Sequence, residues 1–165
     1  MKIGYIGIDP GKSGGIACCY NDDKTFISSK CPEDPADMNA VFEILAFGCD
    51  SVLIKLEHVW GFPTDSSKTA FTFGWNFGCW QTIAEIFKSE FKGNCTFELV
   101  SPRVWQKHFN TPKSDKKKRK AWLKKLACGL LTKSWPCRAY ARSNNPDRAV
   151  ARLDQILAVS RVRAV

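Results

Sequence analysis

Three carboxylates stand out because each one interrupts a pattern that otherwise buries apolar side chains. Asp9 ends the apolar run IGYIGID just before the turn PGKSGG, and Glu57 ends the apolar run of DSVLIKLE. Asp154 falls within the apolar stripe of the helix predicted in DRAVARLDQILAVSRV. An ionised carboxylate beside a core must be paired or must bind a cation, because burying it alone shifts its pKa or costs several kcal/mol. For Asp9 by itself, the alternative is a side chain that only caps the turn.

Carboxylate oxygens are hard ligands, and such ligands suit Mg²⁺ or Mn²⁺. Two ions roughly 4 Å apart can activate an attacking water and stabilise the leaving oxygen when a phosphodiester bond is cut. We therefore predict a site for two divalent cations if the fold brings Asp9, Glu57 and Asp154 together. A zinc site has little support, because the chain contains only two histidines.

The elements that must position these acids follow from hydrophobic periodicity, turn residues and helix caps. Asp34, with Pro35 after it, is typical of a helix start, and Gly48 of a helix end. Ser101-Pro102 predicts another helix start, and Ser114 or Asp115 a further one. In chain order, the prediction is strands at 3–9, 16–20 and 24–30, a helix at 35–47, a strand at 50–57, a helix at 68–91, a strand at 95–100, and helices at 102–109, 115–130 and 147–162.

The order of these elements predicts where two of the acids meet. A strand that follows a crossover helix usually lies parallel to the strand before the helix and next to it. The strand ending at Glu57 should therefore run parallel to the strand ending at Asp9. Both carboxylates are then expected at one edge of a five-stranded mixed sheet flanked by helices. This order, β-β-β-α-β-α-β-α, is typical of the ribonuclease-H-like fold, an α/β fold.

The charge of the chain is divided between two halves. Residues 1–100 carry 8 Lys and Arg against 13 Asp and Glu, whereas residues 101–165 carry 17 against 3. This asymmetry predicts a metal centre beside a track for a polyanion, with a solvated basic face as the alternative. The length of 165 residues fits one domain, 1–165, whose C-terminal half is basic.

The composition also excludes several classes of protein. No stretch approaches the ~18–20 consecutive apolar residues of a membrane span, so we predict no membrane partner. The eight cysteines form no C-x-x-C pairs and are typical of buried thiols in a reducing compartment, such as cytoplasm, a viral factory or an organelle stroma.

The long helix predicted over 68–91 is unusually rich in Phe and Trp for a helix that covers one face of a sheet. Gly74 and Gly78 lie four residues apart on it and permit close approach of another backbone. We predict a homodimer formed through the 68–90 helix, in which a two-fold axis would present two sites to a two-fold substrate. The alternative is that these glycines pack against the sheet of their own chain.

An ordered set of motifs then resembles a known family. IGIDPGKSGGIA, LEHVW, FTFGWNFG, SPRVWQKHF, SDKKKRK and LDQILA occur in this order from residue 3 to about 160. This set is similar to the RuvC-type Holliday junction resolvases, and to their bacteriophage and chloroplast members in particular. The resemblance implies a homodimeric, metal-dependent endonuclease that cuts two opposed strands of a four-way DNA junction.

The same resemblance implies roles for particular residues. Asp9, Glu57 and Asp154 would bind the metal ions, and Lys116 would be the catalytic lysine near the scissile phosphate. The loop after Glu57 and the FTFG segment would touch the junction core and the partner subunit. The predicted DNA contacts are Lys12, Ser13, Phe73, Lys113, Lys117, Lys118, Arg119 and Lys120.

The sequence departs from the family pattern at the fourth acid. The family has a second helix acid three to five residues before the position of Asp154, where this chain has Ala149, Val150 and Ala151. Asp147 is the nearest upstream acid, and a continuous helix would separate it from Asp154 by roughly 10.5 Å of rise. Asp147 is therefore predicted either as the fourth metal ligand or as a charge that stabilises the helix N-terminus.

Other classes of protein share parts of the pattern. An actin-like or sugar-kinase ATPase also begins with Asp-x-Gly and a glycine-rich hairpin, but such proteins need a second related domain that 165 residues cannot supply. A non-catalytic protein that binds branched DNA, and a nuclease of the ribonuclease H or transposase type, remain as alternatives. Cutting of branched DNA in the presence of Mg²⁺ distinguishes among them.

Overall fold

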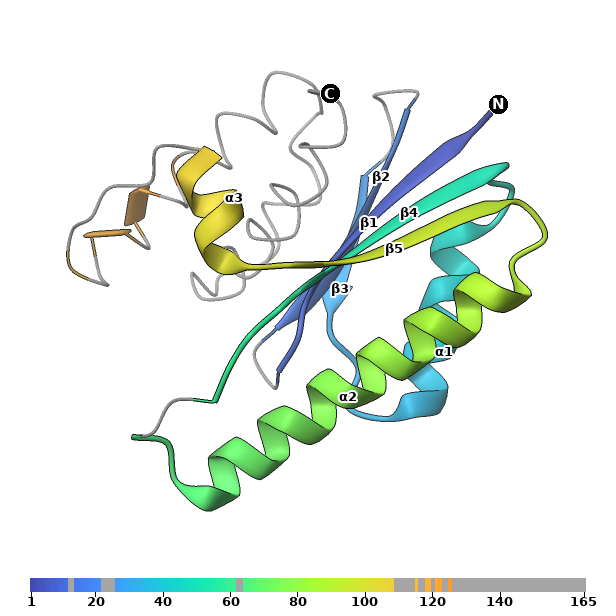
Figure 1. Ribbon diagram of the computed structural model, residues 1–165. Helices are drawn as coiled ribbons and strands as arrows, with labels where there is room; N and C mark the ends of the chain where they lie inside the picture. The colour runs from blue at the N-terminus through green and yellow to red at the C-terminus, as the bar shows by residue number, and fades with distance from the viewer. Residues whose placement is uncertain are drawn as a thin grey trace.

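The structure is a computed structural model that describes residues 1–11, 14–21, 26–61, 64–108, 115, 118–119, 121–122 and 125. Three strands come first, and helices and strands then alternate up to His108, as Figure 1 shows. The elements are β1 (Ile3–Asp9), β2 (Gly15–Tyr20), β3 (Phe26–Lys30), α1 (Pro35–Ala46), β4 (Ser51–Glu57), α2 (Ser67–Glu90), β5 (Asn94–Val100) and α3 (Pro102–His108).

The five strands form one mixed sheet in the order β3-β2-β1-β4-β5. β2 pairs antiparallel with β1 and with β3, whereas β1 pairs parallel with β4, and β4 pairs parallel with β5. The crossover through α1 thus returns the chain beside β1 in the predicted direction. This arrangement confirms the predicted five-stranded mixed sheet.

The main core fills the space between one face of the sheet and the helices α1 and α2, which lie on the same side of it (Figure 1). The even-numbered residues of β1, β2 and β4 enter this core, so the odd-numbered residues of these three strands, including Asp9 and Glu57, face the other side. The core side chains include Ile6, Ile8, Ile16, Cys18, Val52, Ile54 and Leu56 of the strands, and Met38, Phe42, Leu45, Trp80, Ala84 and Phe87 of the helices.

The predicted caps position α1 and α3. The Asp34 side chain accepts a hydrogen bond from the Ala36 N–H (2.8 Å), and Gly48 follows the helix end with a φ of 69°. The Ser101 carbonyl accepts the Val104 N–H (2.9 Å) and starts α3 directly after β5. As a result, α3 lies on the opposite side of the sheet from α1 and α2 (Figure 1).

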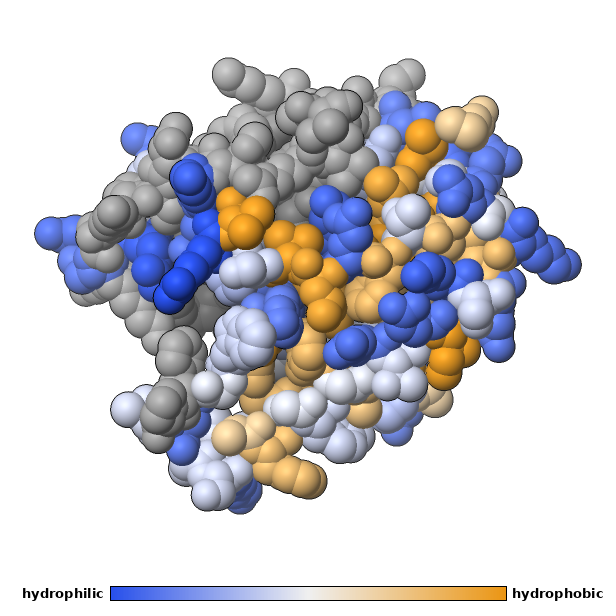
Figure 2. All heavy atoms as spheres, viewed as in Figure 1, coloured by the Kyte–Doolittle hydropathy of each residue, from blue (hydrophilic) through white to orange (hydrophobic). Residues whose placement is uncertain are grey.

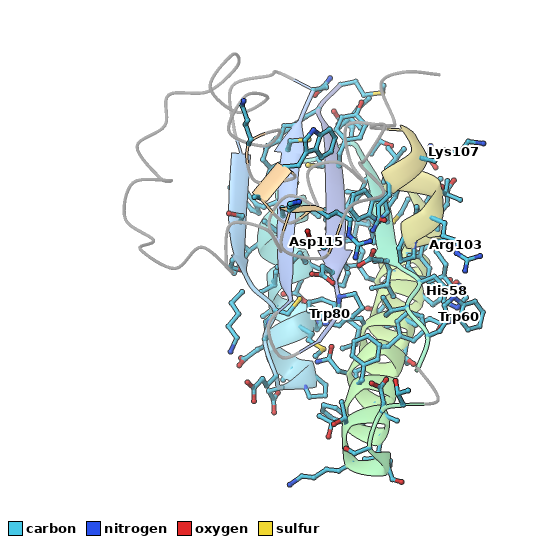
Figure 3. All side chains as sticks on the ribbon, turned by 90° about the vertical axis from the view of Figure 1, so that its left-hand side faces the viewer. His58, Trp60, Trp80, Arg103, Lys107 and Asp115 are labelled. Carbon is cyan, nitrogen blue, oxygen red and sulfur yellow. The ribbon has the colours of Figure 1, made fainter. Side chains whose placement is uncertain are left out.

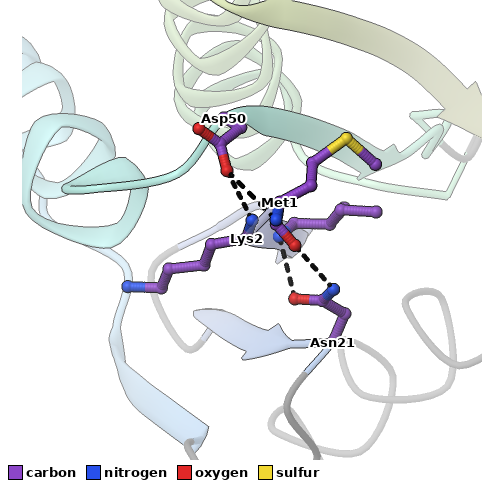
Figure 4. A network of polar contacts seen from close by, with 5 residues as sticks. Met1, Lys2, Asn21 and Asp50 are labelled. Carbon is purple, nitrogen blue, oxygen red and sulfur yellow. Dashed lines mark hydrogen bonds and ion pairs between the residues drawn. The ribbon is translucent and has the colours of Figure 1, made fainter.

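A polar network fixes the starts of β1 and β4 (Figure 4). The Asp50 carboxylate accepts the Lys2 N–H at 2.6 Å and lies 3.8 Å from the N-terminal ammonium group. The Asn21 side chain accepts the Ile3 N–H at 2.9 Å and donates to the Met1 carbonyl at 3.1 Å. The side chains of Asp50 and Asn21 thus each meet partners of complementary charge or hydrogen-bonding type.

The described residues also bear on the cysteines, on the helices and on the predicted cap at Asp115. The six described cysteines carry free thiols, and burial raises the pKa of Cys18 to about 12. Among the described helices, none has the length and apolar character needed to cross a bilayer. The Asp115 side chain accepts the Lys118 N–H at 2.9 Å, and residues 118–119, 121–122 and 125 are helical, as the predicted cap at Asp115 requires. The helix predicted over 147–162 lies outside the described residues.

Candidate active site at the carboxyl ends of the parallel strands

Asp9 and Glu57 come together where β1 and β4 end. Ile8 pairs with Leu56 in the parallel register, so the next residues, Asp9 and Glu57, leave the two strands side by side. A side-chain hydrogen bond joins these two carboxyl groups. The convergence predicted from the parallel crossover is therefore present, and it disfavours the interpretation of Asp9 as a turn cap alone.

Glu57 sits in a largely desolvated position. Its Oε1 accepts a hydrogen bond of 2.9 Å from Nε1–H of Trp105, which α3 places over the end of β4. Burial raises the pKa of Glu57 above its usual value of 4.5, and the hydrogen bonds with Trp105 and Asp9 act in the opposite direction. The pKa of Glu57 is raised because the effect of burial is larger than that of the two hydrogen bonds. A nearby positive charge would stabilise the ionised form of such a carboxyl group.

The turn between β1 and β2 is held from below by α2. The buried Asn76 side chain accepts the Gly11 N–H at 2.7 Å, and a Cβ at Gly11 would lie 3.3 Å from the ring of Phe73. Gly11 also has a φ of 120°, which favours glycine. A Cβ at Gly14 would collide with the Asp9 carbonyl. These constraints explain why a glycine-rich turn must follow the acid.

The chain that leaves β4 also rests on α2. The His58 ring stacks on Phe77, with 5.6 Å between centroids, and its backbone N–H donates to the Val100 carbonyl at 2.9 Å. Trp60 lies against His58 at 4.2 Å and is 66% exposed. Figure 3 shows His58 and Trp60 together, with Arg103 of α3 on the same side. An aromatic and a basic side chain therefore flank the site at the surface.

The structure describes only some of the predicted site residues. It brings Asp9 and Glu57 together and places Phe73 beside the turn that follows Asp9. Lys118 and Arg119 belong to the helical residues that follow Asp115. The remaining predicted site residues lie outside the described part of the chain: Lys12, Ser13, Lys113, Lys116, Lys117, Lys120, Asp147 and Asp154.

Sequence reasoning missed two residues that hold the site, Asn76 and Trp105. Asn76 breaks the apolar stripe that Trp80, Ile83, Ala84 and Phe87 continue along α2. The same signal, a polar residue within a buried helical stripe, singles out Asp154, so it was also available for Asn76. The sequence pattern did not single out Trp105, because a tryptophan in a short amphipathic helix usually indicates only packing against the core.

The donor chemistry of the two carboxyl groups fits a hard divalent cation. Both donors are carboxylate oxygens, and two carboxylates in contact repel each other unless a proton or a cation lies between them. Within the described residues, no group of three or more His, Cys, Asp or Glu side chains is placed to hold a metal ion. The metal-ligand roles of Asp9 and Glu57, like those of Asp147 and Asp154, stay predictions.

The glycines of α2 do not pack against their own chain in the described structure. A Cβ added at Gly74 or Gly78 meets no described atom within 4 Å. This observation contradicts the alternative in which they are packing points against the sheet. Two aromatic side chains nearby are also turned outward, with Phe71 76% and Trp75 48% exposed.

Three solved structures are similar to this chain. The crystal structure of the yeast mitochondrial Holliday junction resolvase Ydc2 matches with a TM-score of 0.51 and 13% identity, over 97% of this chain and 78% of that one. Two Thermus thermophilus RuvC structures, one in complex with a Holliday junction substrate, match at 17% identity with TM-scores of 0.48 and 0.47. They cover 97% and 99% of this chain and 96% and 97% of theirs. No protein-family model and no curated protein matches the sequence.

The match to Ydc2, together with the strand order, confirms the predicted ribonuclease-H-like fold. The resemblance to RuvC-type resolvases inferred from the motifs is thereby supported at the level of the fold. At this identity the likeness is one of architecture.

Proposed function

We propose that this protein is a divalent-metal-dependent endonuclease that resolves four-way DNA junctions. The observation that carries the proposal is the meeting of Asp9 and Glu57 at the ends of adjacent parallel strands, in a desolvated position. Its fold is also that of a protein named as a Holliday junction resolvase. The strongly basic half of the sequence, residues 101–165, supplies the charge that a polyanionic substrate requires.

In this mechanism Asp9 and Glu57 would hold Mg²⁺ or Mn²⁺, together with Asp154 and, in one of the two interpretations above, Asp147. When bound, two such ions supply activation of water and stabilisation of the leaving oxygen in phosphodiester hydrolysis. Trp105 fills the space beside Glu57 and excludes water from one carboxylate oxygen. Asn76 fixes the turn that follows Asp9, so both carboxylates are held in place before substrate arrives.

The decisive experiment is incubation of the purified protein with a labelled four-way junction, a linear duplex, and an RNA–DNA hybrid, each with Mg²⁺ and with EDTA. We expect Mg²⁺-dependent paired cuts in the junction alone. Binding without cutting would favour the non-catalytic alternative. Preferential cutting of the hybrid or the linear duplex would favour the ribonuclease H or transposase-like alternative.

We further propose that the active species is a homodimer joined through the 68–90 helix. No described atom lies within 4 Å of a Cβ added at Gly74 or Gly78, and Phe71 and Trp75 expose apolar area close to them. A second backbone can approach closely at such glycines, and the burial of aromatic surface supplies the driving force. A symmetric junction needs two cuts, and the described chain contributes one Asp9–Glu57 pair per subunit.

Sedimentation at micromolar concentration tests the dimer. Wild type should sediment as a dimer and Gly78→Leu as a monomer, because the leucine side chain fills the space at the proposed contact. Ile86→Ser is a matched control on the exposed side of the same helix, farther from the glycines, and should remain dimeric. A monomeric wild type, or a Gly78→Leu variant that stays dimeric and cuts junctions normally, would remove α2 from the interface.

A further inference from the structure

Trp105 occupies an unusual place for a tryptophan. It is 2% exposed, yet it is not part of the cluster that packs between the sheet and the helices α1 and α2. It lies on the face of the sheet where Asp9 and Glu57 emerge, and its one polar atom donates to Glu57 Oε1 at 2.9 Å. Packing alone does not explain why the indole nitrogen points at a carboxylate.

The backbone leaves Trp105 little freedom to do anything else. β5 pairs with β4 up to the Glu57–Val100 position, and the Ser101 cap then starts α3 at once. The backbone N–H of Trp105 also donates to the Ser101 carbonyl at 3.4 Å. The sheet register and the helix cap together therefore set the position of the indole relative to Glu57.

Trp80 is the natural comparison within the same chain. It is 0% exposed and meets Phe42 edge to face, with 5.7 Å between ring centroids. In the described structure its indole nitrogen has no hydrogen-bond partner. Figure 3 shows it away from His58 and Arg103, which mark the site. Trp80 thus serves the core through its ring alone, whereas Trp105 also uses its N–H.

A glutamate side chain has three rotatable bonds, and a cation site needs its carboxylate in one orientation. A donor that holds one oxygen fixes the carboxylate plane and leaves the other oxygen free to face Asp9. Groups that orient metal ligands in this way commonly change metal affinity by about 10- to 100-fold when they are removed. The indole ring also covers the carboxylate and keeps water from competing for it.

We propose that Trp105 is a positioning residue that orients the Glu57 carboxylate for the divalent cation. This inference rests on the proposed function, because it requires that Asp9 and Glu57 hold such an ion. Trp105 acts through Glu57 and makes no contact with the reacting phosphate.

The test compares Trp105→Phe with Trp80→Phe, because each change removes one buried indole N–H and keeps an aromatic ring. Mn²⁺ alone is titrated into the full-length protein without DNA, and the free Mn²⁺ signal is measured by electron paramagnetic resonance. Trp105→Phe should weaken Mn²⁺ binding by about 10-fold or more, whereas Trp80→Phe should bind as wild type does. Junction binding in EDTA should be unchanged in both variants.

A second measurement needs no change at Trp105. Wild-type protein labelled with ¹⁵N at its six indole nitrogens is titrated with Mg²⁺, and the indole signals are followed by NMR. The Trp105 signal should shift on addition of Mg²⁺, and the Trp80 signal should not. In Glu57→Gln the Mg²⁺ response of Trp105 should disappear. This arm keeps the inference testable even if Trp105→Phe folds poorly.

Equal Mn²⁺ affinity of Trp105→Phe and Trp80→Phe, or a Trp105 signal that ignores Mg²⁺, would overturn the inference. The two proposals fail in different ways. A wild-type protein that binds Mn²⁺ but does not cut junctions contradicts the proposed function and leaves the role of Trp105 open to the same measurements. A wild-type protein that binds no Mn²⁺ contradicts both.

Discussion

The two ends of the parallel strand pair β1–β4 are built on opposite principles. At the strand starts, Asp50 meets the N-terminal ammonium group and a backbone N–H, and Asn21 meets a donor and an acceptor. At the strand ends, Glu57 meets another carboxyl group and an indole N–H in a desolvated position. At the strand starts, groups of the same chain pair with the polar side chains. At the strand ends, two acidic side chains lie together.

The two ends therefore contribute to the free energy of folding with opposite signs. Exposed, complementary pairs contribute modestly, typically about 0–1 kcal/mol. Two half-buried carboxyl groups in contact oppose folding when both are ionised, unless something outside the described contacts neutralises them. A site that is costly without a ligand and matched to a cation is the pattern expected of function rather than of scaffolding.

The two ends should differ most in the effects of substituting Asp9 and Asp50. Asp9→Asn removes a proposed metal ligand and should slow Mg²⁺-dependent cutting by roughly a thousandfold, about 4 kcal/mol of barrier, with junction binding retained. Asp50→Asn should leave cutting unchanged and alter the free energy of unfolding by less than about 1 kcal/mol. Single-turnover cleavage and urea denaturation measure both. Near-normal cutting by Asp9→Asn would show that the acid pair is not catalytic.

The two ends of the strand pair should also differ in the group that supplies positive charge. The N-terminal ammonium group serves the strand starts, and we expect Lys116 to serve the strand ends. Lys116→Ala should slow single-turnover cutting at saturating protein by about a hundredfold, since a cation preorganised at developing charge contributes ~3–4 kcal/mol.

Lys118 provides the matched control for that variant, because its ammonium group is exposed and pairs with Asp115 at 3.7 Å. Lys118→Ala should weaken junction binding and lower the slope of log affinity against log salt by about one, with the rate of chemistry unchanged. If Lys116→Ala behaves like Lys118→Ala, Lys116 binds phosphate and is not catalytic.

At each end an asparagine side chain accepts a hydrogen bond from a backbone N–H of β1 or of the turn after it. Substitution of these two asparagines should affect stability and cutting to different extents. Asn76→Leu leaves the Gly11 N–H without its acceptor in a buried place and should cost about 1–3 kcal/mol of stability. We expect about tenfold slower cutting as the turn after Asp9 shifts. Asn21→Ala at the exposed end should change neither by a comparable amount. Equal effects of the two variants on cutting would contradict a role for Asn76 at the site.

The smallest predicted effect is a dependence on pH. Because burial raises the pKa of Glu57, the folded protein without metal keeps a proton there to higher pH than the unfolded chain does. This contribution to stability is fully present below the usual value of 4.5 and is lost as pH rises through the raised pKa. The loss is at most about 1.4 kcal/mol per pH unit within that interval.

Urea denaturation in EDTA from pH 4 to 8 measures this effect, with Glu57→Gln as the control. The stability of wild type relative to Glu57→Gln should fall as pH rises, and added Mg²⁺ should oppose the fall by favouring the ionised carboxylates. A wild type that gains stability over Glu57→Gln with rising pH would show that Glu57 is paired with positive charge in the free protein.

The sequence was sufficient for features that depend on local pattern and chain direction. The caps at Asp34 and Ser101, the end of α1 near Gly48 and the parallel placement of β4 follow from such rules, and with them the meeting of Asp9 and Glu57. The third strand is described from Phe26 to Lys30, and the first two residues of the predicted strand, 24 and 25, lie outside the described part of the chain.

The contacts that hold the site depended on distances along the chain that no local rule covers. Asn76 is 65 residues from Gly11, and Trp105 is 48 residues from Glu57. In each case a side chain of one helix reaches a backbone or carboxylate group whose position is set by the sheet register. The metal-ligand roles of Asp9, Glu57, Asp147 and Asp154, and the catalytic role of Lys116, remain predictions from the sequence.

Apolar side chains also reach the surface along β5 and the start of α3 (Figure 2), where Leu99 and Val104 are exposed. Leu99 lies on β5 next to Val100, the residue that pairs with Glu57, and Val104 lies on α3 just after the cap at Ser101.

One turn of α2 carries a final consequence. Phe73 and Asn76 contact the turn after Asp9, and Phe77 contacts His58 after Glu57. Farther along, Trp80, Ala84 and Phe87 seat the same helix in the core. The segments that follow Asp9 and Glu57 are thus both attached to α2, so a displacement of this helix would act on both segments at once. The two acids are themselves the last residues of β1 and β4, so the register of the sheet sets the spacing between them.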